Sequence, residues 1–391
     1  MPQLDRRQVL KLFGAIAAAG VTGSAAACTS GPNGEEMEQP SGLSINVGLI
    51  APALGPYSRI GAEITRGFRL YLDDHDGLLG RHQVKVKTAE EGTNADSAVA
   101  AAKSLLDGGD VTALVGLANP ASLAAVAAVA NQAKVPLVSS GASPRALTSP
   151  LFVWRAGYVE GEAGQALAPY AIGTRRRAYI MQEDTAASRV EADQFAAAYE
   201  DLGGRIVGSA DGKVNYAARL RQAEGLGVDV IFAAYTGANA QEFLVAYQAS
   251  GVRTKLVGPG SLTETADVTK LNPLPKNVYT AMYYAPDLDN EDNRRFVASY
   301  QKQHNTQAST YAMAAYDCAA VIDKGLRIME GPPSPTGLNQ AFSLLGQIDS
   351  PRGTWTFNYN RSPQQKWYLR KLRLDGQLAA NLLDTDLAVL S

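Results

Sequence analysis

The sequence has little cysteine, little histidine and almost no net charge, and each shortage excludes a class of protein. Two cysteines among 391 residues cannot build a disulfide framework or a cysteine-rich zinc site. The three histidines, His75, His82 and His304, do not form a metal-binding motif. A net charge of -2, from 36 basic and 38 acidic side chains, gives no electrostatic reason to expect a nucleic-acid binder.

Long apolar runs are also missing after the N-terminal region, so the sequence predicts no membrane-spanning helix in the body of the chain. Hydrophobic residues make up 46% of the chain and charged residues 19%, which predicts a large buried core. At roughly 150 residues a domain, this length is enough for two or three domains.

The N-terminus has the pattern of an export signal. Arg6, Arg7 and Lys11 precede an apolar stretch over 12–21, as in a signal peptide. The Arg6–Arg7 pair is similar to a twin-arginine export motif, and the general secretory route stays as the alternative.

Small residues before Cys28 resemble a bacterial lipobox, in which the peptidase cuts before a cysteine that carries a lipid. Ordinary cleavage after Ala27 is the alternative. We therefore predict a signal peptide over 1–27, lipidation of Cys28, and a flexible tether over 28–42 that is rich in Gly, Pro and acidic residues. The predicted location is extracytoplasmic, anchored by lipid to a bacterial cell membrane.

Apolar periodicity predicts strands and helices in alternation, which is typical of an α/β protein with parallel sheets. In the first part we expect strands at 43–50, 84–88, 111–115 and 135–138, and helices at 62–72, 96–106 and 120–133. A second module has strands expected at 177–181, 205–208, 228–233, 255–257 and 278–284, and helices at 186–202, 216–226, 241–249, 290–304 and 311–330. The segment 353–374 alternates as an antiparallel hairpin would. Two modules in succession predict two lobes with a cleft between them.

Ligands of open parallel sheets bind beyond the carboxyl ends of the strands. Four loops rich in Gly, Pro, Ser and Asn follow predicted strands, at 51–61, 116–122, 139–144 and 235–239. In the second, Asn119 is a good N-cap and Pro120 a good first helical residue. The free N–H groups there favour a ligand carboxylate, and Ser122 can add a hydroxyl. In the third, small residues let a ligand approach the backbone.

Several tyrosines are candidate walls of the cleft. They are Tyr57, Tyr158, Tyr235, Tyr283 and Tyr284, and packing in the core is the alternative for each. Tyr235 and Tyr284 are favoured because they fall at strand ends that face the predicted cleft. Cys318, inside a predicted helix, is interpreted as a small buried thiol.

An ordered set of segments over 43–375 resembles the branched-chain amino-acid binding protein family of ABC importers. The matching segments include Leu49-Ile50-Ala51-Pro52, Val135-Pro136-Leu137-Val138-Ser139, Ala142-Ser143-Pro144, Phe152-Val153-Trp154-Arg155 and Tyr311-Ala312. The resemblance implies the type I periplasmic binding protein fold, with two α/β lobes joined by three hinge crossovers. It places lobe one at 43–156 plus 286–356 and lobe two at 157–285 plus 357–391.

The resemblance also implies ligand contacts. The family's hydroxyl for the ligand carboxylate falls on Ser143, beside the backbone of Gly141 and Ala142, and its second-lobe tyrosine falls on Tyr235. The acidic partner of the ligand's amino group falls on Gly260, followed by Ser261, so Glu160 or Glu264 would have to compensate. The predicted binding residues are Tyr57, Asn119, Ser122, Gly141, Ala142, Ser143, Tyr235, Gly260, Ser261 and Tyr284.

The sequence and the resemblance together predict a lipid-anchored solute-binding protein of an ABC importer. It would bind an amino acid, amide or aromatic acid and deliver it to a membrane permease, as a monomer without a cofactor or metal. A ligand-binding sensor module is the alternative. We predict that the chain is not an enzyme, because no nucleophile elbow, Ser-x-x-Lys pair or phosphate-binding loop occurs.

Overall fold

The computed structural model describes residues 41–147 and 150–390. The predicted signal peptide, Cys28 and nearly all of the predicted tether fall on residues 1–40, outside the described residues. Within the described residues, no helix is both long and apolar enough to cross a membrane.

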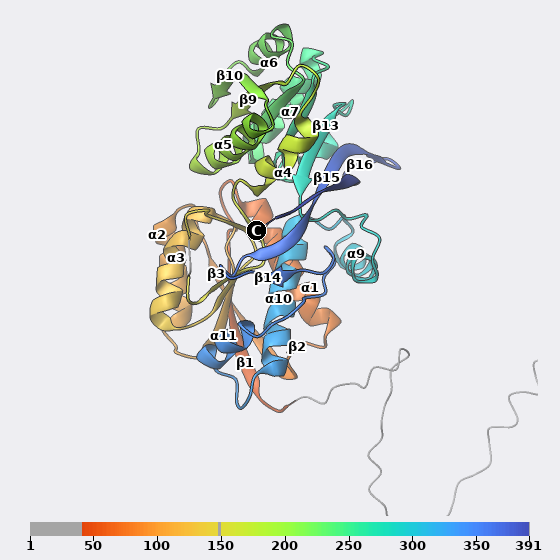
Figure 1. Ribbon diagram of the computed structural model, residues 1–391. Helices are drawn as coiled ribbons and strands as arrows, with labels where there is room; N and C mark the ends of the chain where they lie inside the picture. The colour runs from red at the N-terminus through yellow and green to blue at the C-terminus, as the bar shows by residue number, and fades with distance from the viewer. Residues whose placement is uncertain (1–40, 148–149, 391) are drawn as a thin grey trace, which may run out of the picture. The chain divides into compact units, whose positions relative to one another are not determined.

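The first sheet has six strands in the order β2-β3-β1-β4-β5-β7, and the strands from β3 to β7 are parallel (Figure 1). Its strands are β1 (Ser44–Ala51), β2 (Leu78–Leu79), β3 (His82–Glu90), β4 (Val111–Gly116), β5 (Leu137–Ser139) and β7 (Val153–Arg155). The helices between them are α1 (Ser58–Asp74), α2 (Ala95–Leu106) and α3 (Pro120–Ala133). These elements confirm the alternation expected for the first part of the chain.

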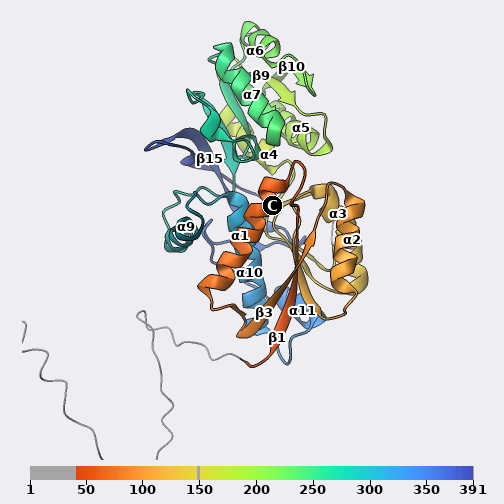
Figure 2. The same ribbon diagram turned by 180° about the vertical axis from the view of Figure 1, so that it is seen from behind.

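Helices cover both faces of the first sheet, as Figures 1 and 2 show from opposite sides. Alternate residues of β1 serve the two faces, since side chains of a strand point in alternate directions. Val47 and Leu49 join the core cluster that holds Ile64 and Phe68 of α1, whereas Ile50 packs into the cluster of α2 and α3. The resulting continuous apolar strand is typical of a parallel sheet buried on both sides.

The second sheet has the order β10-β9-β11-β12-β13-β15-β14, with β16 paired to β15. Its strands are β9 (Arg177–Gln182), β10 (Arg205–Asp211), β11 (Val230–Ala234), β12 (Lys255–Pro259), β13 (Val278–Met282), β14 (Thr356–Phe357), β15 (Pro363–Asp375) and β16 (Leu378–Leu390). Its helices are α4 (Glu162–Ala171), α5 (Ala186–Asp201), α6 (Tyr216–Gly225), α7 (Gly237–Ser250) and the short α8 (Ser261–Glu264), followed by the 3-10 turn η2 (Val268–Lys270).

After β13 the chain returns to the first sheet with α9 (Glu291–His304), α10 (Thr310–Ile328) and α11 (Pro335–Phe342). Two short strands near the first crossover, β6 (Ala142–Ser143) and β8 (Tyr158–Val159), form a separate two-stranded sheet. Helix α10 packs along α1, and its Cys318 is buried as predicted. The chain thus passes between the two sheets three times, after β7, after β13 and before β15. The exact lobe boundaries given above stay predictions.

The C-terminal hairpin differs from the expectation. Only β14 and the start of β15 form the predicted pairing, and the long partner of β15 is β16, which the sequence pattern did not reveal. Two register shifts interrupt the β15–β16 ladder, between Lys366 and Tyr368 and between Leu369 and Arg370. Such bulges break the period of two on which strand recognition depends. Helices α4 and α11 were also missed, because α4 contains Pro169 and α11 has only eight residues.

Two buried ion pairs lie where the chain crosses between the sheets. Arg370 of β15 pairs with Glu264 of α8, and their side chains are 1% and 8% exposed. Thr310 at the start of α10 donates to Glu264, and Arg370 also donates to the backbone oxygen of Tyr284 after β13. This network joins helix α8, the start of α10, the crossover after β13 and strand β15.

The second pair joins Arg352 to Asp317 of α10 at 2.8 Å, with side chains 2% and 0% exposed. Ser350 donates a further hydrogen bond to Asp317, and Gln365 donates to the backbone oxygen of Gly157 in the first crossover at 3.0 Å. Buried charges are tolerated only when paired and hydrogen-bonded, so these contacts fix the crossovers relative to one another.

Replacing Arg370 should test the first network. Arg370→Met leaves Glu264 buried without a counter-charge, and we expect a loss of about 3–5 kcal/mol in the free energy of unfolding, measured by urea denaturation. The control is Lys366→Met on the same strand, which breaks the exposed Lys366–Asp386 pair and should cost less than about 1 kcal/mol. Equal losses in the two variants would contradict the role given to the buried pair.

Candidate functional site

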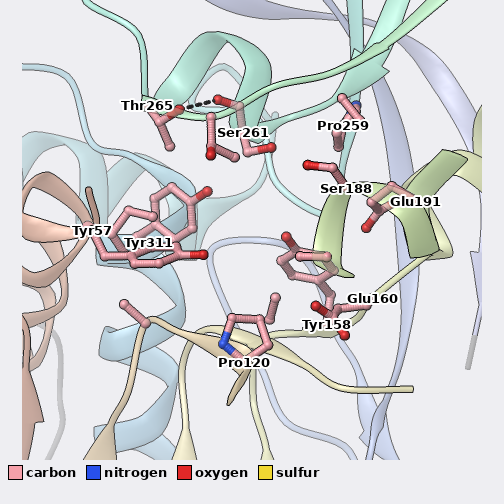
Figure 3. A pocket seen from close by; sticks show the side chains of 16 residues that line it. Tyr57, Pro120, Tyr158, Glu160, Ser188, Glu191, Pro259, Ser261, Thr265 and Tyr311 are labelled. Carbon is pink, nitrogen blue, oxygen red and sulfur yellow. Dashed lines mark hydrogen bonds between the residues drawn. The ribbon is translucent and has the colours of Figure 1, made fainter. Parts of the chain in front are cut away.

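A cavity lies at the ends of both parallel sheets, with about 580 Å³ of atom-free space, part of it open to solvent (Figure 3). Its lining residues are Tyr57, Ile60, Ala118, Pro120, Ala142, Tyr158, Glu160, Ala187, Ser188, Glu191, Ala234, Thr236, Pro259, Ser261, Thr265 and Tyr311.

Strand-end loops of both sheets supply this lining. Each of the four loops singled out from the sequence contributes at least one residue, for example Tyr57, Pro120, Ala142 and Thr236. Most of the other lining residues come from β8 and the residue after it, from α5, from the end of β12 and α8, and from the start of α10. The position agrees with the general rule that ligands of open α/β sheets bind beyond the carboxyl ends of the strands.

Three tyrosines form the aromatic part of the cavity. In Figure 3, Tyr57 and Tyr311 lie across the cavity from Tyr158, with their hydroxyls directed toward it. Tyr158 is held by the rings of Tyr283 and Trp367, at centroid distances of 5.7 and 5.8 Å. Because aromatic neighbours fix its ring, this wall is preformed rather than assembled by a ligand.

Two carboxylates reach the cavity from neighbouring elements. Glu160 follows β8 and Glu191 belongs to α5, and they are 8% and 6% exposed. The Glu191 carboxylate accepts hydrogen bonds from the backbone N–H groups of Gly161 at 2.9 Å and Gly164 at 3.1 Å. Burial nevertheless raises the pKa of Glu191 to about 7, and burial also raises the pKa of Glu160.

The expected anion-binding groups at the start of α3 already have a partner. The N–H groups of Ala118 and Asn119 donate to the carboxylate of Glu91, at 2.8 and 2.9 Å. The Asn119 side chain caps the helix by accepting from Ala121, which confirms the predicted cap. In the second lobe Glu183 plays the same part, accepting from the backbone and the hydroxyl of Thr236. Carboxylates of the chain itself occupy both strand-end anion sites.

A family model described as periplasmic binding protein matches residues 44–377. The chain belongs to the periplasmic binding protein family. A curated relative is Leu/Ile/Val-binding protein homolog 6 of Brucella melitensis biotype 1, which is 25% identical over 342 residues, covering 84% of this chain and 87% of the relative. The family resemblance drawn from the sequence is confirmed.

Solved structures support the same fold. A solute binding protein of an ABC transporter from Rhodopseudomonas palustris BisB5, in complex with 3,4-dihydroxy benzoic acid, gives a TM-score of 0.80 at 20% identity, covering 89% of this chain and 98% of that chain. A branched-chain amino acid transporter substrate binding protein from Streptococcus pneumoniae, in complex with isoleucine, gives a TM-score of 0.76 at 18% identity. The match covers 88% of this chain and 99% of that chain. The predicted two-lobed type I fold is confirmed.

Among the residues predicted to bind ligand in this periplasmic binding protein, Tyr57, Ala142 and Ser261 line the cavity. The other seven lie outside the lining. Asn119 and Gly141 are next to lining residues. Ser122 and Ser143 are fully buried.

Tyr235 and Tyr284, the two tyrosines expected to face the cleft, are buried away from the cavity. Tyr235 is fully buried in the core of the second sheet, stacked on Phe243 at 4.7 Å. Tyr284 is also fully buried, and its hydroxyl donates to Asn293 at 3.0 Å. The expectation that these rings face the cleft is therefore wrong, because a residue at a strand end can point to either face of the sheet.

Gly260 caps α8 and its N–H donates to the backbone oxygen of Ala281. A Cβ at Gly260 would lie 2.6 Å from the Arg370 guanidinium, so an acidic side chain like that of the leucine binders would require Arg370 to shift. Of the two suggested substitutes, Glu160 lines the cavity, whereas Glu264 is paired with Arg370. Sequence reasoning missed Ser188, Glu191, Thr265 and Tyr311 as lining residues.

The raised pKa of Glu191 predicts a pH-dependent stability. Between its ordinary value of 4.5 and about 7, the folded chain binds more protons than the unfolded chain, so the free energy of unfolding should fall as the pH rises through this window. In Glu191→Gln this contribution is absent. We expect the stability of the variant relative to the parent to increase by about 1–3 kcal/mol from pH 5 to pH 8, measured by urea denaturation.

The control for this experiment is Glu200→Gln, an exposed position on the same helix α5. Its stability relative to the parent should stay constant over the same pH range. A Glu191→Gln variant that follows the parent at every pH would rule out titration of the buried carboxylate.

Proposed function

We propose that the chain is the exported, lipid-anchored solute-binding protein of an ABC importer, and that it binds one small polar ligand in the cavity between its lobes. The observation that carries this proposal is the cavity itself, which draws its lining from strand-end loops of both sheets. Solved proteins of the same fold are described as ABC transporter solute-binding proteins, with aromatic acids or isoleucine bound. Amino acids, amides and aromatic acids are therefore the ligand classes to test first.

Delivery to a permease requires that binding change the shape of the protein. A ligand that touches Tyr57 or Pro120 in the first lobe and Ser188 or Thr236 in the second gains contacts from both only when the lobes close. Such a ligand favours the closed state by its differential affinity, and closure needs torsion changes only at the three crossovers. A permease that recognises the closed form would then receive loaded protein. We propose no chemical step, since transport needs only binding and release.

The membrane anchor rests on the sequence of residues 1–40. Lipidation at Cys28 would hold the protein at the outer surface of the cell membrane, with a Gly/Pro-rich tether before β1.

Replacing Cys28 should release the protein from the membrane. With Cys28→Ser, we expect the exported protein to move from the membrane fraction to the soluble extracytoplasmic fraction, measured by fractionation and immunoblotting. Ser30→Ala, two residues away, is the matched control and should remain with the membrane. Membrane association of both variants would argue against lipidation at Cys28.

Ligand binding should appear as thermal stabilisation. For the purified Cys28→Ser chain, a ligand at 100 times its dissociation constant adds about 2.7 kcal/mol, which raises Tm by a few degrees. We expect such a shift with one class in a panel of amino acids, amides, aromatic acids and amines. Ala187→Trp should abolish it, because Ala187 lines the cavity and the indole would fill that space.

Ala186→Trp is the matched control, since Ala186 is exposed and lies outside the cavity lining. It should keep the ligand-induced shift. A flat response across the whole panel, with the parent chain folded, would count against a small-solute binding protein.

A further inference from the structure

The charge of the cavity is one-sided. Among the described residues that line it, Glu160 and Glu191 are the only charged ones, and the others are aromatic, aliphatic or hydroxyl-bearing. Arg145 is the basic side chain whose charge acts on Glu160, but it is exposed and donates its Nε to the backbone oxygen of Glu160 at 3.1 Å. The cavity therefore presents negative charge without a basic side chain in its wall.

These two carboxylates differ in how far the protein satisfies them. Glu191 accepts two backbone hydrogen bonds, one to each oxygen. The side-chain carboxylate of Glu160, a residue that is 8% exposed, receives no hydrogen bond and forms no ion pair within the described residues. A buried carboxylate without a partner is costly unless a cation or donor arrives from outside the chain. Glu160 lines the cavity, so a ligand in the cavity can supply the missing partner of its carboxylate.

The aromatic part of the cavity suits the same kind of ligand. Tyr57 and Tyr311 direct their hydroxyls into the space from one side, and Tyr158 lies opposite them, close to Glu160 in Figure 3. Hydroxyl oxygens can accept hydrogen bonds from an ammonium group, and the apolar parts of the rings can pack against the body of the ligand. The carboxylates and the tyrosines could thus both contact the positively charged group of a ligand.

Ligands that carry only a carboxylate are disfavoured for two reasons. At the start of α3 and at Thr236, the backbone donors are already occupied, at Ala118 and Asn119 by Glu91 and at Thr236 by Glu183. An added anion would also lie near Glu160 and Glu191, and like charges at short range repel.

We propose that the cavity binds a small organic cation, a protonated or methylated amine on an apolar or aromatic body, with Glu160 and Glu191 as its counter-charges and the three tyrosines as its walls. The proposal rests on the proposed solute-binding function and narrows its ligand class. If it is right, a ligand that carries an amine and no carboxylate should bind.

Binding of a cation should depend on pH in a defined direction. The groups that face Glu191 are Glu160, Glu162 and Tyr158, none of them cationic. Because the pKa of Glu191 is raised to about 7, chiefly by burial, part of its charge is absent at lower pH. Affinity for an amine should therefore rise as the pH increases through about 7 and then level off. A ligand with only a carboxylate would show the opposite trend.

The test is isothermal titration calorimetry with matched ligands on the full mature chain. Two sets share a carbon skeleton: phenethylamine, phenylalanine and phenylpropionate, and isoamylamine, leucine and isocaproate. Choline probes a methylated cation. We expect at least one amine or choline to bind, and its acid counterpart to bind at least about tenfold more weakly.

Charge-neutral variants then assign the counter-charges. Glu160→Gln and Glu191→Gln should each raise the Kd of the bound amine at least about tenfold, and Glu191→Gln should also flatten its pH profile. Asp184→Asn removes an equal charge from an exposed position outside the cavity lining and should leave Kd within about twofold. Thermal unfolding of each variant checks that it is folded, and the matched ligands on the parent chain do not depend on any variant.

Each other outcome overturns the inference in a distinguishable way. Binding of an acid but not its amine would overturn it and leave the solute-binding function standing. Binding of phenylalanine or leucine without either amine or choline would show that a carboxylate is required, which also overturns it. No binding by any of these compounds, nor by other amides or acids, would overturn both the inference and the proposed function.

Discussion

The pairing of Arg370 with Glu264 is the interaction on which the two-lobed arrangement depends. It is buried, and it joins helix α8 after β12, the first turn of α10, the crossover after β13 and strand β15 in one network. A side chain at Gly260 would require the same arginine to shift. The hinge and the cavity are therefore not independent parts, because the group that stabilises one also decides which residues can line the other.

That coupling explains why the site is built differently from what family resemblance implies. With glycine at the position after Gly258–Pro259, the negative charge of the cavity comes from Glu160 after β8 and Glu191 in α5. Glu191 is hydrogen-bonded to the backbone of Gly161 and Gly164, which directly follow Glu160 and the first crossover. A fixed fold with three hinges can place the same charge at different points of its cleft, and function resides in that placement rather than in the fold.

The sequence predicts what depends on local chemistry. Asn119 and Pro120 start α3 as expected, and the four loops at strand ends all reach the cavity. The predictions that were wrong concern features that depend on contacts between residues far apart in the chain. Glu91 lies 27 residues before Ala118, so no local pattern announces that its carboxylate fills the α3 anion site. Tyr284 turns away from the cleft because Asn293 offers its hydroxyl a buried partner. Strand β16 escaped recognition because bulges in its pairing with β15 erase the alternation.

Glu91 also has a consequence for how the specificity of such a cleft can change. Its carboxylate accepts hydrogen bonds from the N–H groups of Ala118 and Asn119, where the carboxylate of a ligand could otherwise bind. Neutralising that one side chain would free the two backbone donors for another anion. Glu160 and Glu191 would still line the cavity, so a change from a cationic to an anionic solute would require these two carboxylates to be replaced as well.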